Sequence, residues 1–241
     1  MMELKIYRDK EEVAREFSAY FAELAQGRDA FHVALSGGST PKTVFHILAR
    51  DYSDALDWDK IHLYWGDERC VPPTDQQSNY RMTVEHLISK IEIPQDNINR
   101  ILGENDPQGE ARRYSGLLER NLNSVGGTPQ FDLVILGMGD DGHTASIFPH
   151  QIDLWEAPEH CVVATHPESG QKRVSLNGKV INAASEIAFL VTGDSKSEKV
   201  KAIVEGAQGS EAYPASLVDP EFGNLSWFLD REAASGLIPG P

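Results

Sequence analysis

Two glycines and three hydroxyl residues follow the apolar run at residues 31–35: Ser36, Gly37, Gly38, Ser39 and Thr40. Pro41 comes next and suits the first position of a helix, with Thr40 as its cap. Glycines let backbone amides converge, and a helix N-terminus adds positive potential, so this segment is typical of a phosphate cradle. A plain Gly-rich turn between strand and helix is the alternative. Because no Gly-Lys-Ser/Thr ending follows, a nucleoside triphosphate is not indicated.

Three charged side chains, Asp67, Glu68 and Arg69, follow the next short apolar run, at residues 61–65. Isolated charge clusters usually pair with one another in solvent, and that interpretation stays open here. Strand ends gather at one edge of an α/β sheet, where ligands bind. The position of this triplet therefore makes it a candidate for chemistry.

A third segment, Gly-Met-Gly-Asp-Asp-Gly-His-Thr at residues 137–144, follows the apolar run 131–136. Its glycine spacing matches the dinucleotide fingerprint, but Asp140 and Asp141 would face a pyrophosphate, and the preceding strand is not the first of the fold. His143 at a strand end is either structural or a general base, since histidine has an ordinary pKa of about 6.5. Zinc sites are typically built from His-x-x-x-His or cysteine pairs, so no metal is expected here.

Two further cations lie in the second half of the chain. Arg173 is part of the segment 172–176, and Lys196 opens a helix after a strand that ends in Thr-Gly-Asp at residues 192–194. Each of them, taken alone, is more often a surface charge. The sequence has no Gly-x-Ser-x-Gly elbow, so a serine hydrolase of that type is not indicated.

Short apolar strands alternate with amphipathic helices along the chain. Strands are expected at 31–35, 61–65, 99–102, 131–136, 161–165 and 187–191, and helices at 13–24, 42–48, 78–91, 110–122 and 196–205. This order predicts an α/β fold with a mainly parallel, Rossmann-like twisted sheet and helices on both faces. One domain over residues 1–241 is expected, although a Gly-, Ser- and Pro-rich loop at 123–129 leaves a division in two open.

Composition narrows the range of partners. Hydrophobic residues make up 40% of the 241 residues, and the formal charge of −15 disfavours nucleic acid and anionic membranes. Cys70 and Cys161 form no Cys-x-x-Cys motif, and no leader or long apolar run is visible, so a cytoplasmic location is expected. A monomer and a small homo-oligomer are both left open.

Taken together, these motifs resemble the 6-phosphogluconolactonase family, which shares its fold with glucosamine-6-phosphate isomerase/deaminase. The matching segments are 36–41, 66–69 with 71–72 and 78–79, 137–149, 192–193 with Lys196, and 227–230. The resemblance covers nearly the whole chain. Its most specific part is the run of thirteen consecutive positions at 137–149.

The resemblance implies hydrolysis of 6-phosphogluconolactone to 6-phosphogluconate in the pentose phosphate pathway, without a metal or an organic cofactor. His143 then corresponds to the general base and Asp67 to an acidic neighbour, while Arg69 and Lys196 correspond to phosphate-site cations. A free carboxylate has an ordinary pKa near 4 and is a weak base at neutral pH, so His143 is preferred over Asp67 as the base. The expected substrate-binding residues are Ser36, Gly37, Gly38, Ser39, Thr40, Arg69, Gly139, Asp141, Arg173 and Lys196.

Two other functions stay open. The deaminase branch shares the cradle and the Asp-Gly-His turn, but it usually carries an acidic residue five positions after the histidine, where this chain has Phe148. A non-catalytic sugar-phosphate sensor is the second. It would need a separate DNA-binding partner, because no basic helix-turn-helix segment precedes the cradle.

Overall fold

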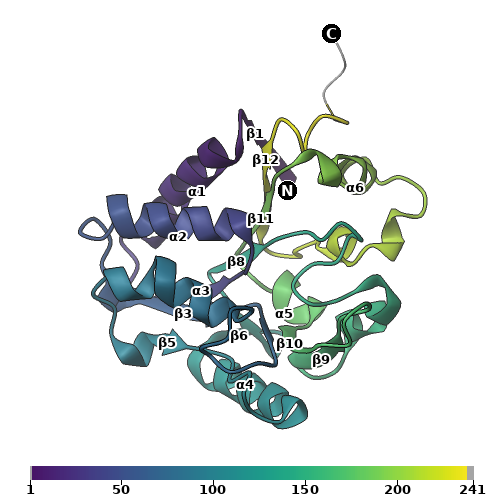
Figure 1. The fold of residues 1–241 in the computed structure, drawn as a ribbon. Coiled ribbons are helices and arrows are strands. Elements are labelled where there is room, and N and C mark those ends of the chain that lie inside the picture. The colour runs from purple at the N-terminus through teal and green to yellow at the C-terminus, as the bar shows by residue number, and fades with distance from the viewer. Residues whose placement is uncertain (1, 238–241) are drawn as a thin grey trace.

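The computed structural model describes residues 2–237. A seven-stranded sheet runs through its centre in the order β1-β12-β11-β8-β2-β3-β5, and all neighbouring strands in it are parallel (Figure 1). Its strands are β1 (Met2–Tyr7), β2 (Phe31–Leu35), β3 (Ile61–Trp65), β5 (Ile98–Asn99), β8 (Leu133–Leu136), β11 (Glu186–Val191) and β12 (Asn224–Asp230). The predicted α/β class with a mainly parallel sheet is confirmed.

The apolar strands in the middle of the sheet are buried, as their sequences predict. The strand expected at 99–102 is wrong in its bounds, since β5 covers only Ile98–Asn99. The chain turns away there because the carboxylate of Glu110 accepts the backbone amide of Leu102 at 2.7 Å. The strands β1 and β12 were not predicted. β1 alternates apolar and polar residues at an edge of the sheet, a weaker signal than a continuous apolar run.

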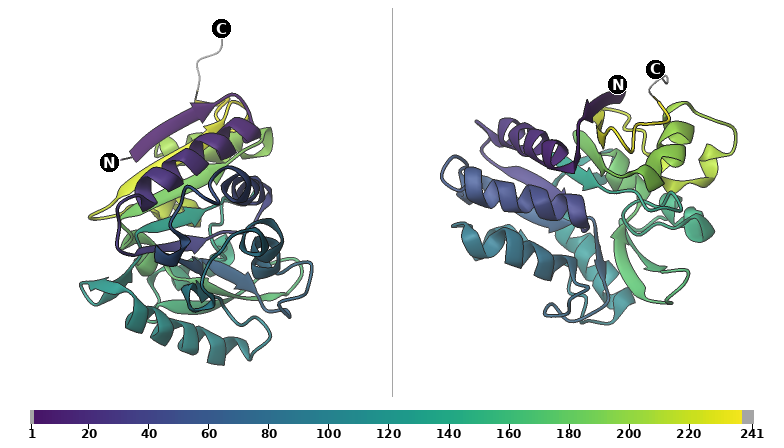
Figure 2. Two further views of the ribbon diagram at one scale, coloured as in Figure 1. Left: turned by 90° about the vertical axis from the view of Figure 1, so that its left-hand side faces the viewer. Right: turned by 45° about the horizontal axis from the view of Figure 1, so that its top comes forward.

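Helices cover both faces of the sheet (Figures 1 and 2). One side carries α1 (Lys10–Ala25), α2 (Ser39–Asp51) and α3 (Asn79–His86), and the other carries α4 (Pro107–Asn121), α5 (Gly178–Asn182) and α6 (Ser197–Val204). Asp9 caps α1 by accepting the amide of Glu12 at 2.9 Å. Asp106 caps α4 in the same way, and Pro107 occupies the first helical position.

A smaller antiparallel sheet stands beside the main one, in the order β4-β10-β9. It consists of β4 (Asp67–Arg69), β9 (Cys161–Thr165) and β10 (Lys172–Leu176). The strand expected at 161–165 therefore exists but belongs to this sheet, because the short turn after it returns the chain antiparallel to itself. The loop expected at 123–129 contains a hairpin of β6 (Asn123–Val125) and β7 (Thr128–Gln130). Buried side chains from the segments before and after this loop in the sequence form one hydrophobic core, as in a single domain.

The strand order reverses between β2 and β8. From β2 the chain runs outward through β3 to β5, and from β8 it runs the other way through β11 to β12. In open α/β sheets, ligands bind beyond the carboxyl ends of the strands at such a switch point. The segment 36–41 follows β2 and the segment 137–144 follows β8, so the fold brings two of the predicted motifs together.

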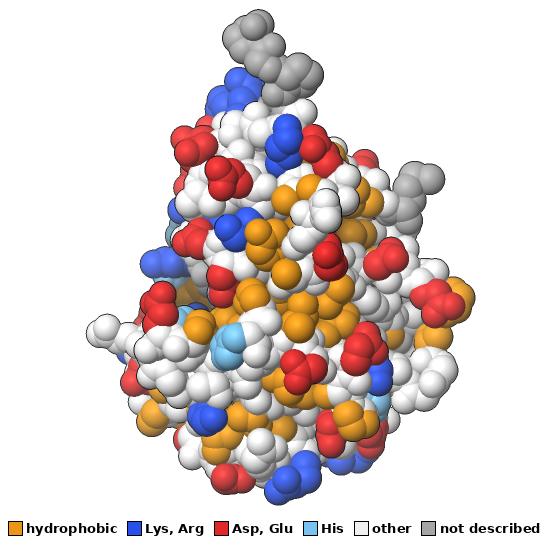
Figure 3. All heavy atoms as spheres, turned by 90° about the vertical axis from the view of Figure 1, so that its right-hand side faces the viewer, with side chains coloured by type: hydrophobic (Ala, Val, Ile, Leu, Met, Phe, Trp, Pro, Cys, Tyr) orange, Lys and Arg blue, Asp and Glu red, His pale blue; other side chains and the backbone are white. Residues whose placement is uncertain are grey.

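The surface agrees with the acidic composition. On the face drawn in Figure 3, Asp and Glu side chains are widely spread, and Lys and Arg side chains are scattered among them. Within the described residues, no helix combines the length and apolar composition that a membrane crossing requires.

Candidate active site

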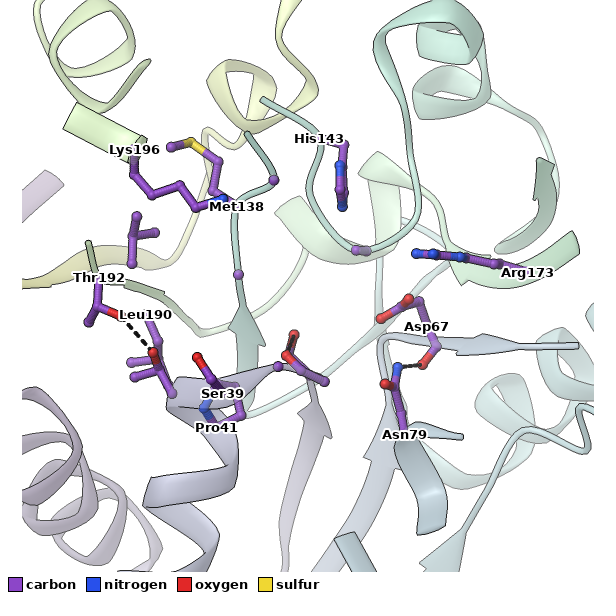
Figure 4. A pocket seen from close by; sticks show the side chains of 18 of the residues that line it. Ser39, Pro41, Asp67, Asn79, Met138, His143, Arg173, Leu190, Thr192 and Lys196 are labelled. Atoms are coloured by element: carbon purple, nitrogen blue, oxygen red, sulfur yellow. Dashed lines mark hydrogen bonds between the residues drawn. The ribbon is translucent and has the colours of Figure 1, made fainter. Parts of the chain in front are cut away.

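A cavity of about 280 Å³ opens at the switch point of the sheet. Nearly all the candidates from the sequence line it, and Figure 4 shows several of them pointing into it from different strand ends. They are Ser36, Gly37, Gly38, Ser39, Thr40, Asp67, Arg69, Gly139, His143, Arg173 and Lys196. Asp141 is not among the lining residues.

The cradle is formed by the loop after β2 and the start of α2. The expected cap was wrong: α2 begins at Ser39, and its N-cap is Gly38, whose φ of 114° favours glycine. Thr40 is the second residue of this helix, and its Oγ1 lies 2.9 Å from Oγ1 of Thr192, the residue that follows β11. The first amides of a helix have no partner inside it, so Ser39 and Thr40 offer donors to an anion in the cavity.

Asn79, the first residue of α3, links the cradle to the segment after β3. Its Nδ2 donates to the backbone oxygen of Asp67 at 3.0 Å. A Cβ atom at Gly37 would overlap with its Oδ1, which gives that glycine a packing role. Asn79 also lines the cavity, although no role was predicted for it from the sequence. Its place in the matching Ser-Asn pair at 78–79 was the only signal.

Glu68 holds this corner of the site together. Its buried carboxylate accepts four hydrogen bonds of 2.8–2.9 Å, from the backbone amides of Arg69, Asn79 and Tyr80 and from the hydroxyl of Ser78. Burial raises the pKa of Glu68, and these four bonds oppose that effect. The carboxylate thus joins β4 to the start of α3.

Asp67 is buried at the floor of the cavity. Its Oδ2 accepts a hydrogen bond of 2.6 Å from the hydroxyl of Ser146, which lies in the segment after β8. The backbone amide of Ser146 in turn donates to Oγ of Ser175 in β10. The sequence could not single out Ser146, because its partner is 79 residues away.

His143 and Asp141 form a pair. Nδ1 of His143 lies 2.6 Å from Oδ1 of Asp141, and the same oxygen accepts the backbone amide of His143 at 3.1 Å. Burial opposes ionisation of Asp141, but the bonds and charge of His143 outweigh it and lower the pKa of Asp141 to about 2. An ionised Asp141 keeps the proton on Nδ1 and leaves Nε2 as the acceptor. A Cβ at Gly139 would overlap the ring, so this glycine makes room for the pair.

Two arginines lie opposite each other on the antiparallel sheet: Arg69 of β4 is the register partner of Arg173 of β10. The Nε atoms of both are buried and have no hydrogen-bond partner within residues 2–237. Burial also lowers the pKa of Arg173. Nη1 of Arg69 donates to the backbone oxygen of Gln77, so the buried donors without a partner are the two Nε atoms. Both arginines line the cavity, and guanidinium groups there are suited to an anionic ligand.

Phe148 packs behind the histidine and one arginine. Its ring centroid lies 4.7 Å from that of His143, and the guanidinium of Arg173 lies 5.4 Å from the same ring. Phe148 is fully buried. The position five residues after the histidine is therefore occupied by a buried aromatic ring.

Lys196 lies on the far side of the cavity from Arg173 (Figure 4). Its Nζ is 2.6 Å from Oδ1 of Asp140, an exposed carboxylate that also accepts the hydroxyl of Ser195 at 3.0 Å. The turn before it is held by Asp230, whose carboxylate accepts the amide of Gly193 at 3.0 Å. Asp140 therefore orients the lysine, and Asp141 orients the histidine.

Residues 2–237 contain no cluster of three or more His, Cys, Asp or Glu side chains suited to a metal.

Comparison with known families decides the relationship. A family model described as glucosamine-6-phosphate isomerases/6-phosphogluconolactonase matches residues 8–227. The chain belongs to this family. Family members similar to it include the 6-phosphogluconolactonase of Treponema pallidum, 43% identical over 87% of both chains. That of Haemophilus influenzae is 42% identical over 92% of this chain and 93% of its own.

Solved structures of the family superpose closely. The crystal structure of a devB protein gives a TM-score of 0.94 at 42% identity and covers 99% of this chain and 100% of its own. The 6-phosphogluconolactonase from Trypanosoma brucei gives a TM-score of 0.89 at 28% identity, with 99% of each chain covered. The resemblance found in the sequence motifs is confirmed, and it extends over the whole fold.

Proposed function

We propose that this protein hydrolyses 6-phospho-D-glucono-1,5-lactone to 6-phospho-D-gluconate in the oxidative pentose phosphate pathway. The observation that carries the proposal is His143, which is paired with Asp141 and lines a cavity that is also lined by the cradle and three cations. Its relatives named 6-phosphogluconolactonase support the same reaction. Two free cysteines, Cys70 and Cys161, are compatible with a reducing cytoplasm.

The chemistry needs one base and donors for developing negative charge. Nε2 of His143 takes a proton from water, and the water oxygen forms a bond to C1 of the lactone. The carbonyl electrons move onto oxygen, and the cavity donors stabilise that oxyanion. When the carbonyl re-forms, the bond between C1 and the ring oxygen breaks, and the ring oxygen leaves as a hydroxyl by taking the proton that His143 removed from water.

The cations on opposite sides of the cavity suit the two anionic groups of this reaction. The cradle and Lys196 line the same cavity, and Thr40 of the cradle contacts Thr192, four residues before Lys196. We assign the cradle amides and Lys196 to the phosphate. Arg69, also predicted from the sequence to bind phosphate, is the register partner of Arg173. Arg173 lies on the other side of the cavity from Lys196 (Figure 4). We assign this arginine pair to the lactone carbonyl, where the two guanidinium groups would stabilise the oxyanion.

The deaminase alternative finds less support in the site. It relies on a carboxylate five positions after the histidine, and this chain has the buried ring of Phe148 there. The histidine is flanked by one carboxylate, that of Asp141. This arrangement orients a base for water but supplies no second acid at that position.

One assay separates the candidate functions. Freshly generated 6-phosphogluconolactone is added, and acid release is followed after subtraction of the spontaneous rate. Glucosamine 6-phosphate is tested in parallel for ammonia release. Accelerated acid release alone supports the lactonase, ammonia release supports the deaminase, and activity on neither substrate favours a sugar-phosphate sensor.

A further inference from the structure

The edge strand β1 carries an uncovered apolar face. β1 ends the seven-stranded sheet and pairs with β12 alone within the described residues (Figure 2). Met2, Leu4 and Ile6 point to one side of it and are 44%, 38% and 39% exposed. They are three of the five large hydrophobic residues that are exposed in residues 2–237.

The neighbouring strand shows that this face continues the core. The register partners of Met2, Leu4 and Ile6 are Leu225, Trp227 and Leu229 of β12, and all three of these are buried. The apolar layer thus extends to the last strand and stops there without a cover. Unpaired backbone groups along such an edge are able to accept another strand, and proteins usually protect them.

The other side of β1 carries charge. Glu3 and Lys5 alternate with the apolar residues, and their side chains lie 3.3 Å apart within the chain. Lys5 also lies over the ring of Tyr20 of α1, with Nζ 4.6 Å from the ring centroid. In the sequence Met-Glu-Leu-Lys-Ile at residues 2–6, apolar and charged residues therefore follow the same order on both sides of Leu4. The two charged residues have opposite signs.

We propose that β1 is the interface of a homodimer, in which β1 of one protomer pairs antiparallel with β1 of its partner. The two seven-stranded sheets then join into one continuous sheet across a two-fold axis at Leu4. Such an axis is perpendicular to the sheet, so it leaves each side chain on the same face. Even-numbered residues of one protomer therefore face even-numbered residues of its partner, and odd-numbered residues face odd-numbered ones.

Charge selects the register. Centring the axis on Glu3 would place the two Glu3 side chains opposite each other, and centring it on Lys5 would oppose the two lysines. Like charges directly opposite destabilise a strand pair. With the axis at Leu4, each Glu3 faces Lys5 of the other protomer. On the apolar face, Met2 then faces Ile6, and Leu4 faces its own copy.

The dimer is expected to be weak at low salt, because each chain carries a formal charge of −15. Added salt should therefore strengthen the dimer. It screens the repulsion between the two net charges more than it weakens the two adjacent Glu3–Lys5 pairs across the interface. The cavity lies at the ends of β2, β8 and β11, away from this edge, so dimerisation leaves it open. The proposal therefore does not depend on the proposed function.

Charge exchange is the direct test. Sedimentation velocity is run over a range of protein concentrations on the wild type, on Lys5→Glu, on Glu3→Lys and on the double exchange of both. We expect a dimer for the wild type, at least a tenfold higher dissociation constant for each single variant, and recovery in the double variant. A wild type that stays monomeric, or a dimer insensitive to the single variants, would overturn the proposal.

A cross-link tests the register separately. In the Leu4→Cys variant, mild oxidation should produce a covalent dimer, since directly opposed residues of antiparallel strands lie within disulfide reach. Val125→Cys, at an exposed position on β6, is the matched control and should remain monomeric. Equal cross-linking of both variants, or none of Leu4→Cys, would contradict an axis at Leu4.

Discussion

Oδ1 of Asp141 accepts two hydrogen bonds from one residue, His143, through the ring Nδ1 at 2.6 Å and through the backbone amide at 3.1 Å. The carboxylate thus determines both the orientation of the imidazole and the nitrogen that carries its proton. Asp141 was expected to bind substrate. The structure places it behind the histidine, outside the cavity lining.

His143→Asn should keep the fold and the affinity for substrate but lower kcat by about 10²- to 10⁴-fold, the usual effect of losing a general base. Asp141→Asn should lower kcat as well, because an amide no longer holds Nδ1 protonated. Initial rates, corrected for spontaneous hydrolysis, and circular dichroism measure the two effects. Near-normal kcat in folded His143→Asn would move the base elsewhere, with Asp67 the next residue to test.

Asp141 should also make stability depend on pH in a defined direction. Its pKa is lowered from 3.8 to about 2, so the folded state favours the ionised form. That contribution is fully present above pH 3.8 and is lost as the pH falls towards 2. Urea unfolding should show a stability difference between wild type and Asp141→Asn that shrinks over this window. A difference that widens there would contradict the assignment.

Glu68→Gln should impair both stability and catalysis. The amide places an NH₂ group against N–H and O–H groups whose hydrogen bonds the carboxylate accepts. This mismatch should lower the free energy of unfolding by about 1–3 kcal/mol. The displaced segments carry Asp67, Arg69 and Asn79, so kcat/KM should fall about tenfold or more, by analogy with misplaced catalytic groups.

Glu110→Gln is the matched control for that variant. Glu110 is equally buried and accepts hydrogen bonds from Leu102 and Arg113, but it does not line the cavity. We expect a comparable loss in the free energy of unfolding with kcat/KM largely retained. Equal losses of activity in both variants would assign Glu68 to stability alone.

Lys196→Ala should raise KM by about 10- to 150-fold, since a charge-assisted hydrogen bond to phosphate contributes about 1.5–3 kcal/mol. Lys201→Ala, a partly exposed lysine on α6, is the control and should leave KM unchanged. If Arg69 stabilises the oxyanion, Arg69→Ala should mainly lower kcat. Arg69→Lys should recover only part of the lost kcat. A KM effect alone in Arg69→Ala would return this residue to the phosphate.

Local sequence patterns were enough to predict the α/β class, the cradle, the Asp-Gly-His turn and the family. Each of these rests on local chemistry: apolar runs that must be buried, glycines where backbone approaches a ligand, and consecutive motif residues. The chain segments that meet at the cavity were also predictable, because parallel strands end at the same edge of a sheet.

The contacts between distant side chains became visible only in the folded chain. Ser146 meets Asp67 across 79 residues, and Thr40 meets Thr192 across 152, so no local pattern records either contact. The assignment of residues 161–165 to a second sheet likewise depends on pairing with β10, since an isolated apolar strand does not encode its partner. Hydrogen bonds between distant segments form only after the core has brought the segments together. For this reason these bonds could not be predicted from the sequence.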